Sequence, residues 1–291
     1  MCGLWSLLCA LCFLPFGGAV PATPSPTSAD APFASFNWSG YVLSGPRGSI
    51  RGVQGSWIVQ RVHPEPNDTY SAEWVGVDGF SGGGLIQTGT ESDSIKRVPT
   101  YDAWVELATP GERLLSMSVR PGDVMAATLV EDKTGRWMVT LRDVTRHERY
   151  SATVDHPTSD TSAEWIEERP VLSYARVSSL ANLSYFQVAR FGRRYTGSLP
   201  DAADVRRAIG ATAPTTLRAV EMLLVPGPLD RVALDHVGAL EDDGASFAVT
   251  RTKPFASGTT GAVSPTTTNS PVLRAGVSDC ILLQSAGISG G

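Results

Sequence analysis

Cysteine is scarce in this chain of 291 residues, and it is unevenly placed. Three of the four cysteines, Cys2, Cys9 and Cys12, lie near the N-terminus, and Cys280 lies near the other end. Once the N-terminal segment is set aside, a single thiol can form neither an intramolecular disulfide nor a cysteine-rich zinc site. We therefore expect a protein that is stabilised by its hydrophobic core.

Basic residues are also few, and they form no cluster. The 24 Lys and Arg residues are outnumbered by 29 Asp and Glu residues, which gives a formal net charge of −5. A protein that binds nucleic acid presents grouped basic side chains to the phosphate backbone. We expect no nucleic-acid partner for this chain.

Two familiar hydrolase patterns are missing as well. The chain contains no His-Glu-x-x-His motif for zinc and no Asp-Thr-Gly or Asp-Ser-Gly motif for a pair of catalytic aspartates. The four histidines all have polar, turn-like neighbours; they are His63, His147, His156 and His236. The sequence therefore predicts neither a metal ion nor another cofactor.

The N-terminus has the features of an export signal. Residues 4–16 form an apolar run of about the length of a signal-peptide core, shorter than the roughly 20 residues of a membrane span. Val20 and Ala22 are small residues at the −3 and −1 positions of a cleavage site, although no Lys or Arg precedes the run. We expect a signal peptide over residues 1–22 and a secreted protein with no stable membrane association after cleavage.

Residues 36–252 have the pattern of an all-β domain. Short apolar stretches alternate with turn signals, and little of the chain shows helical periodicity. So many short strands predict one sandwich of two packed antiparallel sheets. The expected strands are residues 37–43, 56–59, 72–77, 85–88, 101–106, 125–130, 137–142, 163–168, 184–188, 219–224 and 246–250.

The rest of the chain is expected to lie outside this sandwich or to be inserted in it. Residues 23–35 are rich in Pro, Ser and Thr, which predicts a linker, and residues 253–291 have a similar low-complexity composition, which predicts a flexible tail. One short inserted helix is expected over residues 201–209.

Tryptophans recur beside carboxyl groups. Trp74, Trp104 and Trp165 each lie within a few residues of an acidic side chain, in SAEWVGVDG, YDAWVEL and SAEWIEE. An indole beside a carboxyl group lowers the local dielectric constant and raises the pKa of the acid. The repetition favours chemistry that is based on carboxyl groups.

These segments resemble the glutamic peptidases, or eqolisins, in their order and spacing across residues 33–252. The matching segments are NWSGYV (37–42), GSW (55–57), EWVGVDG (73–79), LIQTGT (85–90), YDAWVE (101–106), PGD (121–123) and AEWIEE (163–168). The resemblance implies a concanavalin-like or lectin-like β-sandwich of two bent antiparallel sheets, whose concave face holds a protein or peptide substrate. It implies an endopeptidase with a glutamine and a glutamate as its catalytic residues.

The resemblance assigns the catalytic pair to Gln87 and Glu168. Gln87 lies in LIQTGT, and Glu168 lies three residues after Trp165, where the family has its catalytic glutamate. On a regular strand Glu164 and Glu168 share one face and Glu167 lies on the other, which makes Glu167 the poorer candidate. Alternation does not separate Glu164 from Glu168, so that choice depends on the resemblance alone.

Supporting residues follow from the same resemblance. Trp74, Asp78, Trp104 and Glu106 match positions in the family's substrate groove, and Glu91 occupies a position where the family has an aspartate. We expect Asp78 and Glu106 to be neighbours of Glu168 and to raise its pKa. We expect activity at about pH 3 to 5, because unperturbed carboxyl groups titrate there, and a monomer.

Two other functions fit parts of the pattern. In a sandwich-fold glycoside hydrolase or lectin-like carbohydrate binder, Glu106 and Glu168 would flank a sugar on which tryptophans stack. That hypothesis leaves Gln87 and its motif without a role. A secreted binding module without catalysis is the other alternative, and the presence of both Gln87 and Glu168 argues against it.

Overall fold

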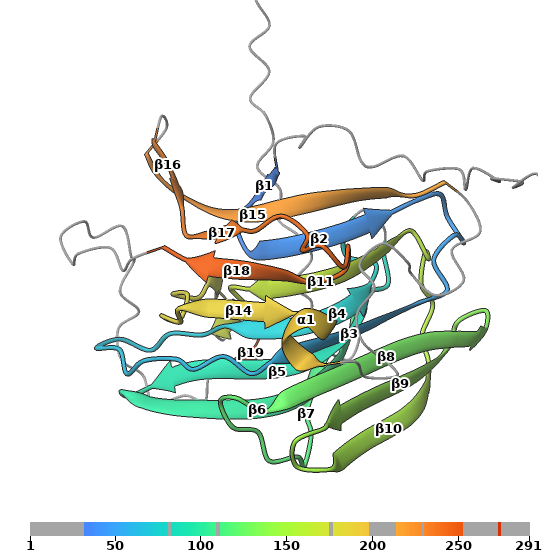
Figure 1. Ribbon diagram of the computed structural model, residues 1–291, viewed down its shortest axis with the longest axis horizontal. Helices are drawn as coiled ribbons and strands as arrows, with labels where there is room; N and C mark the ends of the chain where they lie inside the picture. The colour runs from blue at the N-terminus through green and yellow to red at the C-terminus, as the bar shows by residue number, and fades with distance from the viewer. Residues whose placement is uncertain are drawn as a thin grey trace, which may run out of the picture. The chain divides into compact units, whose positions relative to one another are not determined.

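The computed structural model describes residues 32–80, 83–108, 111–174, 177–197, 214–227, 230–252 and 273–274. All of these belong to one compact unit. Strands dominate this part of the chain, and the one helix in it, α1, is a single turn at Arg193–Thr196 (Figure 1). No helix within the described ranges is long and apolar enough to cross a membrane.

The first sheet has nine strands and carries the segments of interest. In spatial order they are β1 (Phe33–Ser35), β15 (Thr216–Gly227), β2 (Trp38–Ser44), β11 (Ser162–Glu168), β4 (Ala72–Val77), β5 (Ile86–Ile95), β6 (Val98–Leu107) and β7 (Gly111–Leu114), while β16 (Asp230–Ala233) pairs with β15. Its pairs are antiparallel except β1 with β15.

A second sheet of seven strands lies against the first. Its order is β10 (Glu148–Asp155), β9 (Arg136–Asp143), β8 (Val124–Lys133), β3 (Gly52–Ile58), β14 (Val188–Phe191), β18 (Phe247–Arg251) and β17 (Asp235–Val237). A third, small sheet has the order β13 (Val177–Leu180), β12 (Val171–Tyr174) and β19 (Leu273–Arg274). The predicted all-β sandwich with antiparallel sheets is confirmed.

The main hydrophobic core lies between the two large sheets. Trp165 and Val75 project into it from the first sheet, and Trp57, Trp137 and Phe247 project into it from the second. Because side chains alternate along a strand, the other residues of β11 and β4 point away from this core. Their outer face carries a separate buried cluster that contains Trp38, Trp74, Trp104 and Ile166.

Several predicted boundaries need correction. The strand that we expected at residues 184–188 begins only at Val188, because Ser184 instead bonds through its N–H to the Tyr70 carbonyl oxygen outside the sheet. The last residues of the expected linker form β1, which pairs with β15. Leu273–Arg274, inside the expected tail, pair with β12. The expected helix at residues 201–209 and the signal peptide lie outside the described residues.

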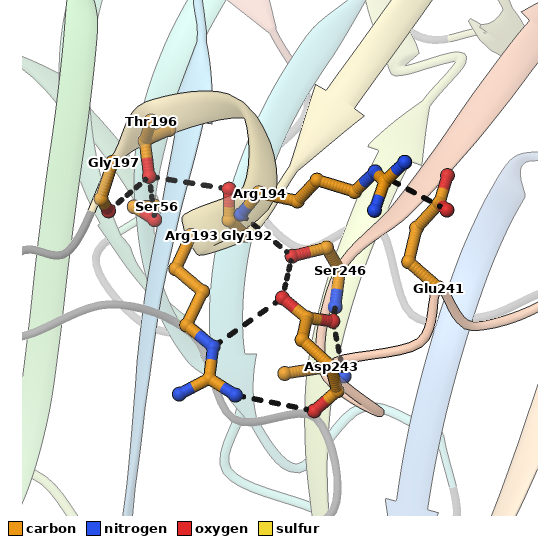
Figure 2. A network of polar contacts seen from close by, with 10 residues as sticks. Ser56, Gly192, Arg193, Arg194, Thr196, Gly197, Glu241, Asp243 and Ser246 are labelled. Atoms are coloured by element: carbon orange, nitrogen blue, oxygen red, sulfur yellow. Dashed lines mark hydrogen bonds and ion pairs between the residues drawn. The ribbon is translucent and has the colours of Figure 1, made fainter.

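The turn after β17 is held to α1 by a polar network (Figure 2). Asp243 accepts hydrogen bonds from Ser246 Oγ at 2.6 Å, from Ser246 N–H at 2.8 Å and from Arg193 Nε at 3.3 Å. Partial burial opposes ionisation, but these donors outweigh it and hold the pKa of Asp243 at about 2. Gly192 has a φ of 96°, and a Cβ there would lie 2.5 Å from Ser246 Oγ, so the approach of α1 requires glycine.

Candidate active site

Three parallel rows of side chains cross the outer face of the first sheet. The cross-strand register places Glu164, Gly76, Gln87 and Glu106 opposite one another on β11, β4, β5 and β6. Residues that are directly opposite in a sheet point to the same face. Since neighbouring strands lie about 4.8 Å apart, the Cα atoms of Glu164 and Gln87 are roughly 10 Å apart, and the residue between them in the row, Gly76, has no side chain of its own.

The next two rows run parallel to the first along the same strands. The middle row contains Ile166, Trp74, Gly89 and Trp104, and the third contains Glu168, Ala72, Glu91 and Asp102. Gln87 and Glu164 therefore lie in the first row and Glu168 lies in the third. The middle row, which contains two tryptophans, separates these two rows of carboxyl groups.

Gln87 is held in one orientation. Its Nε2 donates a hydrogen bond to Glu106 Oε2 at 2.7 Å, and the side chain is only 1% exposed. Gln87 Oε1 is buried and has no hydrogen-bond partner among the described residues. A side-chain amide carries two N–H donors and one acceptor oxygen, so the oxygen and the second N–H of Gln87 remain for a water molecule or a substrate.

Glu168 is held by an indole. Trp74 Nε1 donates a hydrogen bond to Glu168 Oε2 at 2.8 Å, and the Trp74 ring packs edge-on against Trp38 at 4.8 Å between centroids. The far edge of the same ring reaches Gly76, where a Cβ would lie 2.9 Å from Trp74 Cζ3 and 3.1 Å from Gln87 Cβ. The indole of Trp74 therefore extends from Glu168 to the backbone beside Gln87.

Two strand glycines make room for the indoles. A Cβ at Gly89 would lie 2.5 Å from Trp74 Cβ and 3.0 Å from Trp104 Cζ2. Gly76 and Gly89 were not among the residues that we predicted for the site. A glycine inside a strand is the signal that could have found them, because it often marks a close approach by a neighbouring group.

Asp78 is not part of this arrangement. Its carboxylate accepts hydrogen bonds from the N–H groups of Ser159, Asp160 and Thr161, the last two at 3.0 and 2.8 Å. Asp78 lies beside Ser162, and Glu168 is six residues further along β11, or roughly 20 Å away. The expectation that Asp78 is a neighbour of Glu168 was wrong, because the backbone N–H groups of the loop before β11 bind this carboxylate.

The other predicted residues are divided between the two outer rows of carboxyl groups. We expected Glu106 to be a neighbour of Glu168, and this was wrong. Glu106 accepts a hydrogen bond from Gln87 instead, because its register places it four residues along the sheet from the row of Glu168. Glu91 shares the row of Glu168 across Ala72. Glu167 faces the inter-sheet core, where Gln60 Nε2 donates to its Oε1 at 3.1 Å, so it lies on the other face of β11 from Glu164 and Glu168, as strand alternation predicts.

Within the part of the chain that the structure describes, no three His, Cys, Asp or Glu side chains are arranged to hold a metal ion. The arrangement instead offers carboxyl groups, a fixed amide and indole N–H donors. Such a set can transfer protons and stabilise an oxyanion.

Comparisons with known proteins identify a family and a shared fold. A model of the peptidase A4 family matches residues 36–206, which is more than half of the chain. No curated protein sequence matches it. Two solved structures of scytalido-glutamic peptidase, each with a transition-state analogue, are similar, with TM-scores of 0.60 and 0.59. A third, of SCP-B from the eqolisin family with the tripeptide Ala-Ile-His, has a TM-score of 0.56. Each is 16% identical to this chain, and each match covers 75% of this chain and 98% of the other.

Proposed function

The chain belongs to the peptidase A4 family, and from this premise we propose that Gln87 and Glu168 are its catalytic pair. The protein is a glutamic-type endopeptidase that acts on proteins or peptides. The observation that supports the pair is the common outer face: Gln87, Trp74 and Glu168 all project from the side of the first sheet that points away from the main core.

The proposed reaction is hydrolysis by an activated water molecule. Glu168 removes a proton from the water as its oxygen attacks the carbonyl carbon of the scissile peptide bond. The tetrahedral intermediate then collapses as Glu168 delivers that proton to the amide nitrogen, and the C–N bond breaks. Glu168 is thus first a base and then an acid, and it ends in its starting form.

Gln87 contributes without titrating. Its Oε1 accepts a hydrogen bond from the attacking water, and the Nε2 hydrogen that Glu106 does not use is donated to the oxyanion of the intermediate. One fixed donor to an oxyanion contributes on the order of 3 kcal/mol. We expect Gln87→Ala to lower kcat by about 10² to 10³ in a protein-digestion assay, with KM changed much less.

Glu164 is the second candidate for the acid–base role, and one observation favours it. It lies in the same row as Gln87, across Gly76, whereas Glu168 lies four residues along β11 from that row. The position of Glu168 in the family motif and its bond from Trp74 support Glu168 instead. Conversion of each glutamate to glutamine, one at a time, separates the two assignments.

The carbohydrate hypothesis is not retained. It requires Glu106 and Glu168 to face each other across a sugar. Glu106 instead accepts a hydrogen bond from Gln87 and lies in a different row from Glu168. The family assignment also makes the protein a peptidase.

The working conditions are part of the proposal. A carboxyl group that acts as both base and acid operates near its own titration range, so the best activity should lie at about pH 3 to 5. The apolar run at residues 4–16 supports export of an enzyme that begins at Thr23. We further propose that the exported enzyme is a monomer. N-terminal sequencing and size measurement of the protein from culture medium test this, and a chain that keeps Met1 would contradict it.

A further inference from the structure

A second pair of carboxyl groups is buried on the opposite face of the same two strands. Glu73 on β4 and Glu167 on β11 are directly opposite each other in the antiparallel register, and both are 0% exposed. Directly opposite side chains have their Cβ atoms about 5 Å apart, and two like charges at such positions repel. Neither residue has a role in the proposed reaction, since both face the core between the sheets.

Gln60 connects the two carboxyl groups. Its backbone N–H donates to Glu73 Oε1 at 3.0 Å, and its Nε2 donates to Glu167 Oε1 at 3.1 Å. Glu167 Oε2 and Gln60 Oε1 are buried and have no hydrogen-bond partner among the residues described. Two acceptors thus lack a donor, and a proton on Glu167 Oε2 would supply one, because a protonated carboxyl group donates through its O–H.

The second oxygen of Glu73 lies close to hydroxyl groups. Thr90 Oγ1 and Ser92 Oγ lie 3.4 and 3.5 Å from Glu73 Oε2. Such long, neutral contacts compensate poorly for the transfer of a carboxylate from water into a protein core. The surroundings therefore favour the neutral acid over the ion.

Other ionisable groups face the pair from neighbouring strands. These groups are Tyr101 on β6, Asp235 on β17 and Arg251 on β18. The positive charge of Arg251 interacts with both Asp235 and Glu167. Arg251 donates from Nε to the Ser184 carbonyl oxygen at 3.4 Å and from Nη1 to the Leu234 carbonyl oxygen. Ser39 Oγ donates to Asp235, whose second oxygen has no partner in the described part of the chain. The guanidinium group of Arg251 therefore faces two buried acids, Glu167 and Asp235.

Burial raises the pKa of Glu73 to about 8. Burial, together with the adjacent charge of Glu73, raises the pKa of Glu167 well above its usual range. In the unfolded chain a glutamate titrates near about 4.3, so above that pH the folded protein holds protons that the unfolded chain has released. Stability from these protons is complete below about pH 4.3 and is lost as the pH rises towards the folded-state values.

We propose that Glu73 and Glu167 form a proton-dependent switch, which keeps the sandwich closed in acid and drives β4 and β11 apart when the protons leave. The same strands carry Trp74 and Glu168 on their other face, so separation of the strands dismantles the catalytic face. The enzyme thus loses its fold on leaving an acid compartment, independently of how its catalytic residues titrate.

The test is the pH dependence of unfolding by urea between pH 4 and pH 8. For each proton held only by the folded chain, the unfolding equilibrium constant of the wild type rises tenfold per pH unit. Glu73→Gln and Glu167→Gln should each weaken this dependence by about one proton, and the double variant should keep only the dependence that comes from other buried acids such as Asp235. Asp242→Asn removes an exposed carboxyl group from the turn after β17 and should follow the wild type. A double variant with the wild-type dependence would overturn the switch.

A measurement on the wild-type chain covers the case in which the variants do not fold. Carbon-13 NMR of labelled glutamate side chains at pH 6 should show two carboxyl carbons with the chemical shift of a neutral acid. If every glutamate titrates near its ordinary value, the switch does not exist. The folded double variant should also retain the wild-type kcat at pH 4, because neither residue touches the catalytic face.

Discussion

At the scale of single residues, the proposed catalysis depends on how Glu168 is held. Trp74 donates to Glu168 Oε2 at 2.8 Å, and a hydrogen bond to a charged group contributes about 1.5 to 3 kcal/mol. Trp74→Phe keeps an aromatic ring but removes this donor. We expect kcat/KM to fall about 10- to 100-fold in a peptide cleavage assay, with most of the loss in kcat.

Trp137→Phe is the matched control for that substitution. Trp137 is fully buried in the main core, and its Nε1 has no hydrogen-bond partner within the described ranges, so no donor to the active site is lost. Its kcat/KM should equal that of the wild type. Equal losses in the two variants would mean that the indole of Trp74 only packs.

Asp78 has a structural task that its motif did not indicate. Its buried carboxylate accepts hydrogen bonds from backbone N–H groups of residues 159–161 and from Thr161 Oγ1 at 2.8 Å. Each buried donor that loses its partner costs about 1 to 3 kcal/mol. We expect Asp78→Ala to lower the free energy of unfolding by at least about 3 kcal/mol in urea titrations. If the Asp78→Ala variant is as stable as the wild type but impaired in catalysis, Asp78 acts in the active site after all.

At the scale of strands, the glycines of β4 and β5 control how closely the indoles lie to the sheet. A Cβ at Gly76 would meet Trp74 Cζ3 at 2.9 Å, which is too close for an unshifted ring. We expect Gly76→Ala to displace Trp74 and to lower kcat by about tenfold or more, since small misplacements of catalytic groups are costly.

Gly83→Ala is the control for that steric effect. A Cβ at Gly83 would have no atom within 4 Å, so this variant should keep wild-type kinetics. Crystal structures or fluorescence of the Trp74 environment would report the displacement in Gly76→Ala. An unmoved indole together with full activity would refute the role of Gly76.

The strands that could be predicted are those with apolar residues on a regular period. The prediction for residues 72–77 coincides with β4, whose residues are all buried. β10 was missed because its sequence, ERYSATVD, alternates between exposed and partly buried positions and contains few apolar residues. Its strand character comes from pairing with β9.

The site was predictable to the extent that it follows from motifs. Family position named Gln87 and Glu168, and strand alternation was applied only to the glutamates of residues 163–168; the structure then placed both residues on the outer face of the first sheet. The sequence does not contain the register between strands, so it did not predict that Glu106 lies beside Gln87 or that Glu164 shares their row. Register depends on how distant strands pack, and this is decided by the whole sandwich.

At the scale of the whole molecule, stability should depend on pH through its buried acids. Besides the Glu73–Glu167 pair, burial raises the pKa of Asp235 to about 7. In the unfolded chain an aspartate titrates near about 3.9, so stability from this proton is complete below that pH and is lost as the pH rises towards 7.

Thermal unfolding checks this contribution. We expect Asp235→Asn to weaken the fall in Tm between pH 4 and pH 7 relative to the wild type. Asparagine does not titrate, so the folded variant no longer holds a proton at this position that the unfolded chain releases. If Tm falls equally in both proteins, Asp235 is ionised in the folded state.

In the proposed reaction Glu168, with Gln87, performs the proton transfers of a glutamic peptidase. Its most direct test is the kcat of Glu168→Gln and Glu164→Gln on a denatured protein at about pH 4, within the titration range of carboxyl groups. A general acid–base contributes about 10²- to 10⁴-fold to the rate. The kcat of Glu168→Gln should therefore fall by at least about 10²-fold, while Glu164→Gln should keep most of the wild-type kcat. Full activity in Glu168→Gln together with its loss in Glu164→Gln would mean that Glu164, and not Glu168, is the general acid–base.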